Sequence, residues 1–225
     1  MPKKVDHDAR RGEIADAFLR VTAREGYEAA TSRAVAQELG VAIGALWHYF
    51  SGFDAVIDAA MDAVVARTNQ RITATAEGLR GLAAVDAIVT EMLPLTKETR
   101  DEAHVVVGFW GRLSARGATA PDWSGDDDWL AALRRHLDEA KQLGELRPDA
   151  DPEQLTTLLE AVFWGRQIVE VISSAPVDAA QHRAAAATAL LPWIVTGAAD
   201  GLAADRSDRI HTAHGQTPAP RASTT

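Results

Sequence analysis

The chain of 225 residues contains no cysteine, which excludes disulfides, thiolate metal sites and a cysteine nucleophile. It also lacks a run of about 18 apolar residues, so we expect no transmembrane helix and no membrane partner. The first residues, Met-Pro-Lys-Lys-Val-Asp-His-Asp, include no apolar stretch that would form a secretory signal. A glycine-rich phosphate loop, a nucleophile elbow and a metal-binding cluster are absent as well. These absences predict a cytoplasmic protein that is not an enzyme and uses no metal or cofactor.

Strand-like alternation is also lacking, and apolar residues recur instead with the 3.6-residue period of helices. The expected fold is all-α, with about nine helices. A head of three helices would cover residues 1–53, and a helical body would cover residues 54–203. A kink is expected near Pro192, and the polar residues 204–225 are expected to be disordered. Outside the segment 31–50, the expected helices cover residues 8–25, 54–77, 82–93, 97–115, 126–143, 152–173 and 177–199.

The most informative segment, residues 31–50, predicts two short helices folded around a tight turn. Gly40 can adopt the positive φ at which one helix ends and the chain turns at once. Ala36 is small at the point where the first of these helices must lie close to the second. This is the helix-turn-helix geometry, which places a helix in the major groove of DNA. The apolar seam between the two helices would consist of Val35, Leu39, Val41, Leu46 and Phe50.

The net charge of −9 is unfavourable for DNA binding, but the charge is unevenly distributed. Residues 1–50 carry seven basic and seven acidic side chains, so the whole acidic excess lies in residues 51–225. DNA would therefore repel the protein everywhere except at the head. Four basic residues at the N-terminus either form an arm that contacts phosphates or only keep the terminus soluble: Lys3, Lys4, Arg10 and Arg11.

Residues 10–60 contain four features in order: one expected helix, the pattern Thr-Ser-x-x-Val-Ala-x-x-Leu-Gly-Val, the sequence Leu-Trp-His-Tyr-Phe and a long expected helix. In this order the chain resembles the TetR family of transcriptional regulators. Residues 144–154, Gly-Glu-Leu-Arg-Pro-Asp-Ala-Asp-Pro-Glu-Gln, are similar to the C-terminal domain of the BetI-like branch. The resemblance implies a homodimer in which the last two helices of each chain form a four-helix interface. It also implies a ligand pocket in the body that controls DNA affinity.

The resemblance assigns DNA contacts to residues of the helix-turn-helix. Thr31 would cap the second helix and meet a phosphate, or it would act as an N-cap alone. Three positions depart from the family pattern, because Ile43, Ala45 and Phe53 stand where polar or lysine side chains are usual. Packing is the alternative role for Trp47 and Tyr49. The residues expected to contact DNA in this segment are Thr31, Ser32, Arg33, Ala42, Ile43, Ala45, Trp47, His48 and Tyr49.

Five of the six tryptophans lie after residue 100, in the expected body. Each alone is best explained by core packing, but together they favour a pocket for a mainly hydrophobic or aromatic effector. His104 has no histidine or carboxylate three or four residues after it, so a helical metal-binding pair in that direction is absent. The residues expected to line the pocket are Met61, Met92, His104, Trp110, Trp129, Trp164 and Gln167.

The last two expected helices combine bulky apolar residues with a run of alanines, and alanine lets helices approach closely. This composition favours a dimer interface, although an amphipathic helix packed within one chain would show a similar pattern. The residues expected at the interface are Leu159, Phe163, Ala186, Leu190, Trp193 and Ile194.

These features predict a ligand-responsive repressor that binds a palindromic operator in double-stranded DNA as a homodimer. A small effector bound in the body would release it from the operator. The alternative is a helical small-molecule-binding protein with no role at DNA. Arg33 and the basic N-terminal residues distinguish the two, because a carrier protein would have no use for them.

Overall fold

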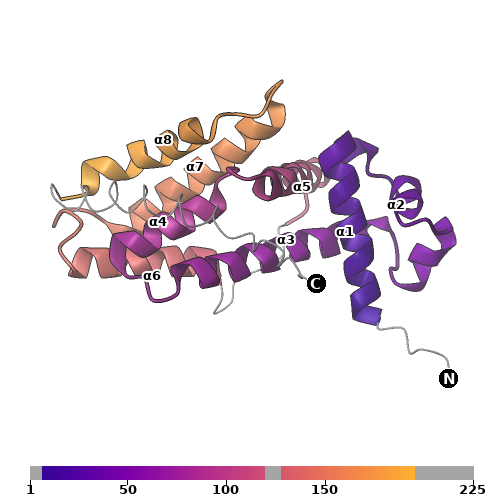
Figure 1. Ribbon diagram of the computed structural model, residues 1–225, viewed down its shortest axis with the longest axis horizontal. Coiled ribbons are helices and arrows are strands. Elements are labelled where there is room, and N and C mark those ends of the chain that lie inside the picture. Colours follow the sequence, from indigo (N-terminus) through magenta and orange to yellow (C-terminus); the bar gives the residue numbers. More distant parts are fainter. Residues whose placement is uncertain (1–6, 120–127, 196–225) are drawn as a thin grey trace, which may run out of the picture.

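The computed structural model describes residues 7–119 and 128–195, and it confirms the all-α architecture. A small head is joined to an elongated body by one long helix, α3 (Figure 1). Within the described ranges, no helix is long and apolar enough to span a membrane. The head and the joining helix consist of α1 (His7–Glu25), η1 (Tyr27–Ala29), α2 (Ser32–Glu38), η2 (Ile43–His48) and α3 (Phe53–Ala76). The body adds α4 (Gly81–Met92), α5 (Lys97–Arg116), α6 (Trp129–Gln142), α7 (Pro152–Ile172), α8 (Ala179–Leu190) and η3 (Leu191–Trp193).

Local sequence signals set several of these helix ends. The side chain of Asp151 accepts a hydrogen bond from the N–H of Glu153 at 3.0 Å, and Pro152 occupies the first turn of α7. At the start of α5, Thr96 and Thr99 form a reciprocal capping box. The residues predicted to form the basic arm (Lys3 and Lys4) and the predicted disordered tail lie outside the described residues.

The start of α4 is fixed by side chains from another part of the body. Glu139 of α6 accepts a hydrogen bond from the N–H of Gly81 at 3.0 Å, and Glu145 accepts one from the N–H of Leu82 at 2.8 Å. The Gly81 N–H, followed by the side chains of Arg80 and His136, holds the pKa of Glu139 at about 2. These two carboxylates satisfy N–H groups that would otherwise lack partners, and they tie α4 to α6.

The last helix is shorter than predicted. α8 ends at Leu190, one short 3-10 helix follows, and the chain is extended at Ile194, where the prediction continued the helix to residue 199. Pro192 cannot continue the hydrogen-bonding pattern of an α-helix. The chain after Pro192 pairs instead with the loop before α7. Leu146 and Ile194 form an antiparallel bridge, and the N–H of Arg147 donates to Trp193 O at 2.8 Å.

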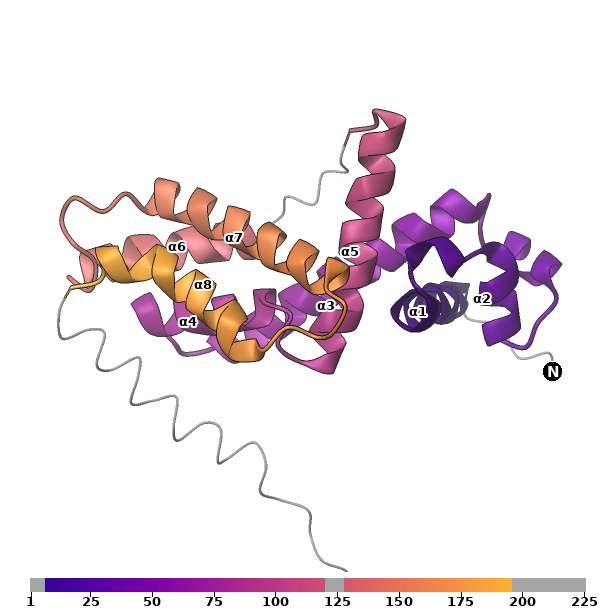
Figure 2. The same cartoon turned by 90° about the horizontal axis from the view of Figure 1, so that it is seen from above.

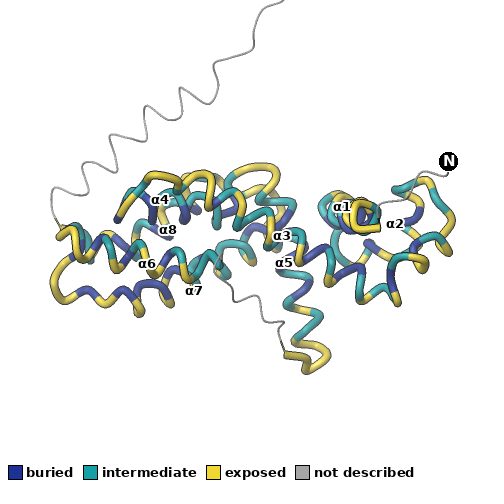
Figure 3. The backbone as a smooth tube through the Cα atoms, turned by 90° about the horizontal axis from the view of Figure 1, so that it is seen from below, coloured by how far each residue is buried: buried dark blue, intermediate teal, exposed yellow. Residues whose placement is uncertain are grey.

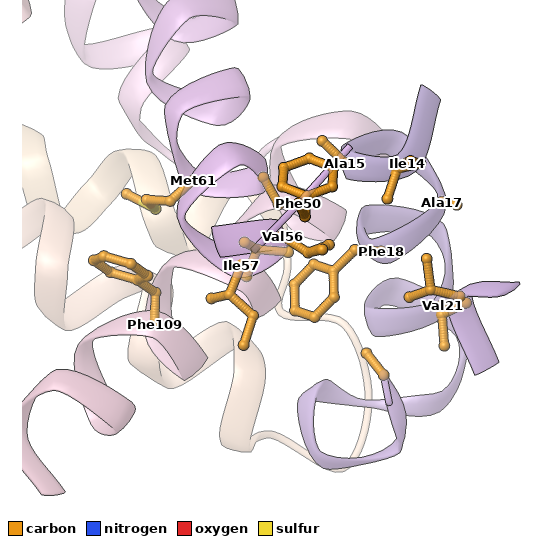
Figure 4. Close-up of a cluster of buried hydrophobic side chains, with 14 of the residues drawn as sticks. Ile14, Ala15, Ala17, Phe18, Val21, Phe50, Val56, Ile57, Met61 and Phe109 are labelled. Carbon is orange, nitrogen blue, oxygen red and sulfur yellow. The ribbon is translucent and has the colours of Figure 1, made fainter. Parts of the chain in front are cut away.

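The buried side chains form two clusters. The first joins the head to α3 and α5, because Phe18 of α1 and Ile57 of α3 belong to the same cluster as Phe109 of α5. Figure 4 shows this continuity, with Phe109 and Met61 on one side and the α1 residues on the other. The second cluster fills the space between α4, α6, α7 and α8. The head is therefore packed directly against α5.

Helix α5 lies across the long axis of the molecule, between the head and the remaining body helices (Figure 2). Its C-terminal turns extend beyond the other helices and are largely exposed (Figure 3). Its central part packs against α1, α3 and α7. This placement brings one helix into contact with both halves of the protein.

Candidate nucleic-acid interface and body cavity

The helix-turn-helix forms at the predicted residues. Thr31 caps α2, because its Oγ1 accepts a hydrogen bond from the N–H of Ala34 at 3.3 Å. Gly40 has a φ of 66°, and the next N–H, that of Val41, donates to the carbonyl of Ala36 at 3.0 Å. The second helix of the pair, η2, is a 3-10 helix whose Leu46 is fully buried. The expected seam therefore holds η2 against the rest of the head.

The residues expected to contact DNA lie on α2 and η2 at the outer end of the head (Figure 3). Arg33 is exposed and forms no ion pair with another described residue. Ile43 and Trp47 keep 43% and 42% of their surface exposed, so Trp47 is not a core residue. The other exposed residues of the set are Thr31, Ala42 and His48, and the partly buried ones are Ser32, Ala45 and Tyr49.

Arg11 takes a role that the sequence did not predict. Its Nη1 donates to the carbonyl of Tyr49 at 2.6 Å, and its guanidinium carbon lies 4.2 Å from the ring centroid of Phe50. These contacts hold the end of η2 against α1. Arg10 forms an ion pair with Glu13 of the same helix. The structure thus gives Arg11 a positioning role in the head, which differs from both roles that the sequence left open for it, a phosphate-contacting arm and a solubilising terminus.

A cavity of about 70 Å³ lies in the body, between α3, α4, α5, α6 and α7. Its wall is mainly apolar, with Val64 of α3 and Ala103 and Val106 of α5 among the residues that line it. Five of the seven residues predicted for a pocket belong to this wall: Met61, Met92, Trp129, Trp164 and Gln167.

The other two predicted pocket residues, His104 and Trp110, do not line this cavity. On α5 the lining positions are 99, 102, 103 and 106, which form one face of the helix. His104 points away from that face, because it follows residue 102 by about 200° around the helix. Trp110 lies one turn beyond the cavity, where its ring packs edge-to-face on Trp164 with centroids 5.1 Å apart. It supports a wall residue instead of facing the cavity.

The polar end of the cavity is organised by Arg71 of α3, which the sequence analysis missed. Its Nε lies 3.1 Å from Glu91, its Nη1 lies 3.3 Å from Glu98, and its Nη2 lies 2.7 Å from Glu102. Burial raises the pKa of Glu102, and the hydrogen bond from Arg71 opposes that shift. The available signal was spacing, since residues 61, 64, 68 and 71 lie on one face of α3 and all line the cavity.

Gln167 of α7 presents a further polar atom at this site. Its Oε1 is buried and has no hydrogen-bond partner among the described residues. The same residue lines the cavity. A buried amide oxygen without a partner is costly, and a ligand with a hydrogen-bond donor would satisfy it.

The head and α5 meet at an unusually close contact. The ring of Tyr27 in η1 packs onto Gly108 of α5, where there is no room for a Cβ atom. Two arginines further along α5, Arg112 and Arg116, form ion pairs with Asp54 at the start of α3. The part of α5 after the cavity is therefore attached to both the head and the joining helix.

The residues predicted for the dimer interface are mostly buried inside the chain itself. Four of them pack in the chain's own core between α4, α6, α7 and α8; these are Leu159, Phe163, Ala186 and Leu190. Trp193 and Ile194 are partly buried beside the same core. The apolar period of α7 and α8 therefore marked the side that faces the chain's own core.

A helix-turn-helix head on a helical body with an internal cavity defines the chain as a transcriptional regulator. Residues 14–60 match the model of the bacterial regulatory proteins of the tetR family, and residues 81–191 match that of the BetI-type transcriptional repressor, C-terminal. The HTH-type transcriptional regulator PksA of Bacillus subtilis is 33% identical over 169 residues, which cover 72% of this chain and 80% of PksA. The chain belongs to the TetR family of transcriptional regulators.

Solved structures show the same fold. A transcriptional regulator from Rhodococcus sp. Rha1 is 26% identical, with 83% of this chain and 98% of that chain covered and a TM-score of 0.64. A regulator from Saccharomonospora viridis, solved in complex with choline, is 18% identical and has a TM-score of 0.68. In that case 81% of this chain and 96% of the other chain are covered, and the likeness extends to the fold alone.

Proposed function

We propose that this protein is a cytoplasmic repressor that binds a palindromic operator as a homodimer and leaves it when a small effector enters the body. The observation that carries the proposal is the position of α5. Glu102 and Val106 line the cavity, whereas Gly108 and Phe109 contact the head and its core. A shift of this one helix on ligand binding would therefore displace the head.

The cavity is too small for an effector without movement of its walls. A volume of about 70 Å³ holds a few water molecules. Pockets for small molecules typically span roughly 300–1,000 Å³. We therefore expect the walls to separate when an effector binds, and two of these walls are α3, which leads into the head, and α5, which contacts the head. Binding would shift the population toward a state with the heads at a different separation.

The charges at the cavity favour an effector with a positive group next to its apolar or aromatic part. Arg71 pairs with two carboxylates that line the cavity, Glu91 and Glu102, and with Glu98 outside the lining, so carboxylates outnumber the one guanidinium here. Two tryptophans, Trp129 and Trp164, line the wall, and a cation over the face of such a ring gains about 0.5–2 kcal/mol. The regulator from Saccharomonospora viridis that shares this fold was solved with choline, which is itself a cation.

We infer that the dimer interface lies on the outer side of α7 and α8, opposite the core-facing residues. Ile168 and Ile172 are 46% and 73% exposed there, and an apolar surface of this kind is typical of a protein interface. Small residues elsewhere on the same surface, among them Ala161 and Gly165, allow helices of two chains to pack closely. The exposed stripe contains no charged residue and consists of Leu158, Ala161, Gly165, Ile168, Ile172, Ala180, Ala184, Thr188 and Leu191.

Sedimentation velocity tests this interface. Ile168→Glu puts a charge in the middle of the stripe and should convert the dimer to a monomer at micromolar concentration. The matched control is Leu143→Glu, because Leu143 is 49% exposed but lies at the end of α6, outside the stripe. A dimer that persists in Ile168→Glu, or that is lost equally in both variants, contradicts the placement.

Selection from a pool of random duplexes tests the regulator itself. We expect the dimer to enrich a palindromic sequence at low salt, and mass spectrometry of the native protein to reveal any co-purified effector. Adding that effector should release the duplex. If no duplex is retained at low salt, the protein is instead a helical small-molecule-binding protein.

A further inference from the structure

The residues at the start of η2 have no side chain that can form a hydrogen bond. Ala42, Ile43 and Gly44 are consecutive and exposed, and they precede the first polar side chain of this element by several positions. Among the described residues of α1, α2 and η2, the large apolar side chains that are exposed are those of Ile43 and Trp47. An exposed isoleucine at this point has no role in the core of the head.

In a helix-turn-helix the N-terminal residues of the second helix reach the base edges in the major groove. Those edges present hydrogen-bond donors, acceptors and one apolar group, the C5-methyl of thymine. An isoleucine placed against a donor or acceptor would remove water from it without replacing the hydrogen bond, which is unfavourable. Against a thymine methyl, the same side chain gains apolar contact and leaves no polar group unsatisfied.

The backbone that carries Ile43 is held in place from several sides. Leu46 is fully buried and Phe50 is 3% exposed, so η2 is anchored along its inner face. Arg11 fixes the far end through its hydrogen bond to the carbonyl of Tyr49. Isoleucine is branched at Cβ and has few rotamers, so little side-chain freedom is lost when it meets a base.

We propose that Ile43, with Ala42 beside it, selects T·A base pairs in each operator half-site by contact with thymine methyl groups. This inference rests on the proposed DNA-binding function and adds a specificity determinant to it. Arg33 and His48, which are exposed and polar, would contact the phosphate backbone on either side. Direct readout by η2 would then depend on a methyl group instead of on hydrogen bonds.

Uracil substitution tests the proposal, because uracil pairs as thymine does and lacks only the methyl group. The full-length protein is first used to select its preferred duplex from a random pool. Each thymine of one half-site is then replaced singly by uracil, and affinity is measured by fluorescence anisotropy. We expect at least one position at which the loss is about fourfold, the value for burial of one methyl group. Replacing the symmetry-related thymine of the other half-site as well should lower the affinity by about 15-fold in total.

The variant Ile43→Ala assigns the effect to this residue. It should bind the thymine and uracil duplexes with nearly equal affinity. Leu143→Ala, a substitution of a similarly exposed apolar residue on α6, should keep the fourfold preference.

A selected duplex that tolerates uracil at every position overturns the inference while supporting the regulator. Persistence of the methyl effect in Ile43→Ala also overturns it, since another residue then reads the methyl. Failure to select any duplex overturns the proposed function together with it.

Discussion

Replacing Gly108 by alanine tests whether α5 transmits changes from the cavity to the head. An added Cβ would lie 2.7 Å from Cε2 of Tyr27 and closer still to Cγ and Cδ2. Carbon atoms pack at about 3.5–4.0 Å, so relieving the shortest of these contacts requires α5 and η1 to separate by roughly 1.5–2 Å. The Tyr27 ring cannot simply turn aside, because it packs edge-to-face on Phe18 with centroids 5.7 Å apart. The substitution therefore moves the head relative to α5 without touching the cavity or the DNA surface.

Gly111→Ala provides a matched control in the same helix, since a Cβ at that position meets nothing within 4 Å. Both substitutions gain up to about 1 kcal/mol from helix propensity. Only Gly108→Ala suffers overpacking, which costs about 1–3 kcal/mol. We expect the free energy of unfolding in urea to be higher for Gly111→Ala than for the wild type. For Gly108→Ala it should lie about 1–3 kcal/mol below the value for Gly111→Ala.

DNA affinity gives the decisive measurement. If α5 couples the two sites, Gly108→Ala should weaken binding of the selected duplex by at least about fivefold, and Gly111→Ala should leave it unchanged. In a double-mutant cycle with Tyr27→Ala the two substitutions should be non-additive, because the clash disappears with the ring. Equal stability and equal DNA affinity of the two alanine variants would refute the reasoning.

Three further predictions concern charged groups. Burial lowers the pKa of His182, so below pH ~6.5 the histidine is protonated more readily in the unfolded chain than in the folded chain. The free energy of unfolding should therefore fall as the pH drops from 7.5 to about 5.5. The fall should be less steep in His182→Gln, which lacks the titrating group. Arg71→Met leaves the buried Glu102 without its ion-pair partner and should lower the free energy of unfolding by about 3 kcal/mol, whereas Arg134→Met, which removes an exposed pair, should cost under about 1 kcal/mol. Arg33→Ala should weaken DNA binding and reduce the slope of log affinity against log salt by about 1, and an unchanged slope would remove Arg33 from the phosphate contacts.

The lowered pKa of His182 has a clear structural origin. Its Nδ1 accepts a hydrogen bond from Nε of Arg166 at 3.0 Å, and its Nε2 donates to Glu170 at 3.0 Å. Arg100 of α5 approaches the same carboxylate at 3.4 Å. A second proton on the imidazole would face the guanidinium of Arg166, which opposes protonation. Identical pH dependence in the wild type and His182→Gln would show that other groups cause the loss of stability.

Much of the fold could be predicted because local signals agree with the final packing. The periodic helices, the glycine turn at Gly40 and the proline start of α7 depend on residues close to one another in sequence. The end of the last helix could not be predicted in the same way. It is set by pairing between Leu146 and Ile194, which are far apart in the chain. Pro192 signalled an interruption, but only the pairing with Leu146 shows that the helix does not resume after it.

The site was only partly predictable for a related reason. Periodicity shows which residues share a face, but it does not say which face meets the core, a ligand or a second chain. The apolar period therefore pointed to Leu159 and Phe163, which are buried, whereas the exposed apolar residues of α7, on which the proposed interface rests, include Ile168. The ion pairs of Arg71 were missed because they join α3 to α4 and α5, and no local pattern links those positions.

The small volume of the cavity is what would allow an effector to control DNA affinity. A ligand that binds two states of a protein with equal affinity does not change the equilibrium between them, however tightly it binds. A full switch from 99:1 to 1:99 needs about 5.5 kcal/mol of difference in affinity between the states. At about 25 cal/mol per Å², this corresponds to roughly 220 Å² of apolar ligand surface that only the opened cavity can bury.

That area is close to the upper limit for one aromatic side chain, which buries about 150–250 Å². An uncharged effector should therefore be larger than a single ring to switch the protein fully. A smaller cation reaches the same difference only if its charge also interacts with the carboxylates around Arg71 in the opened state. Effector size and effector charge are thus linked: the smaller the ligand that releases DNA, the more its action must depend on Glu91 and Glu102.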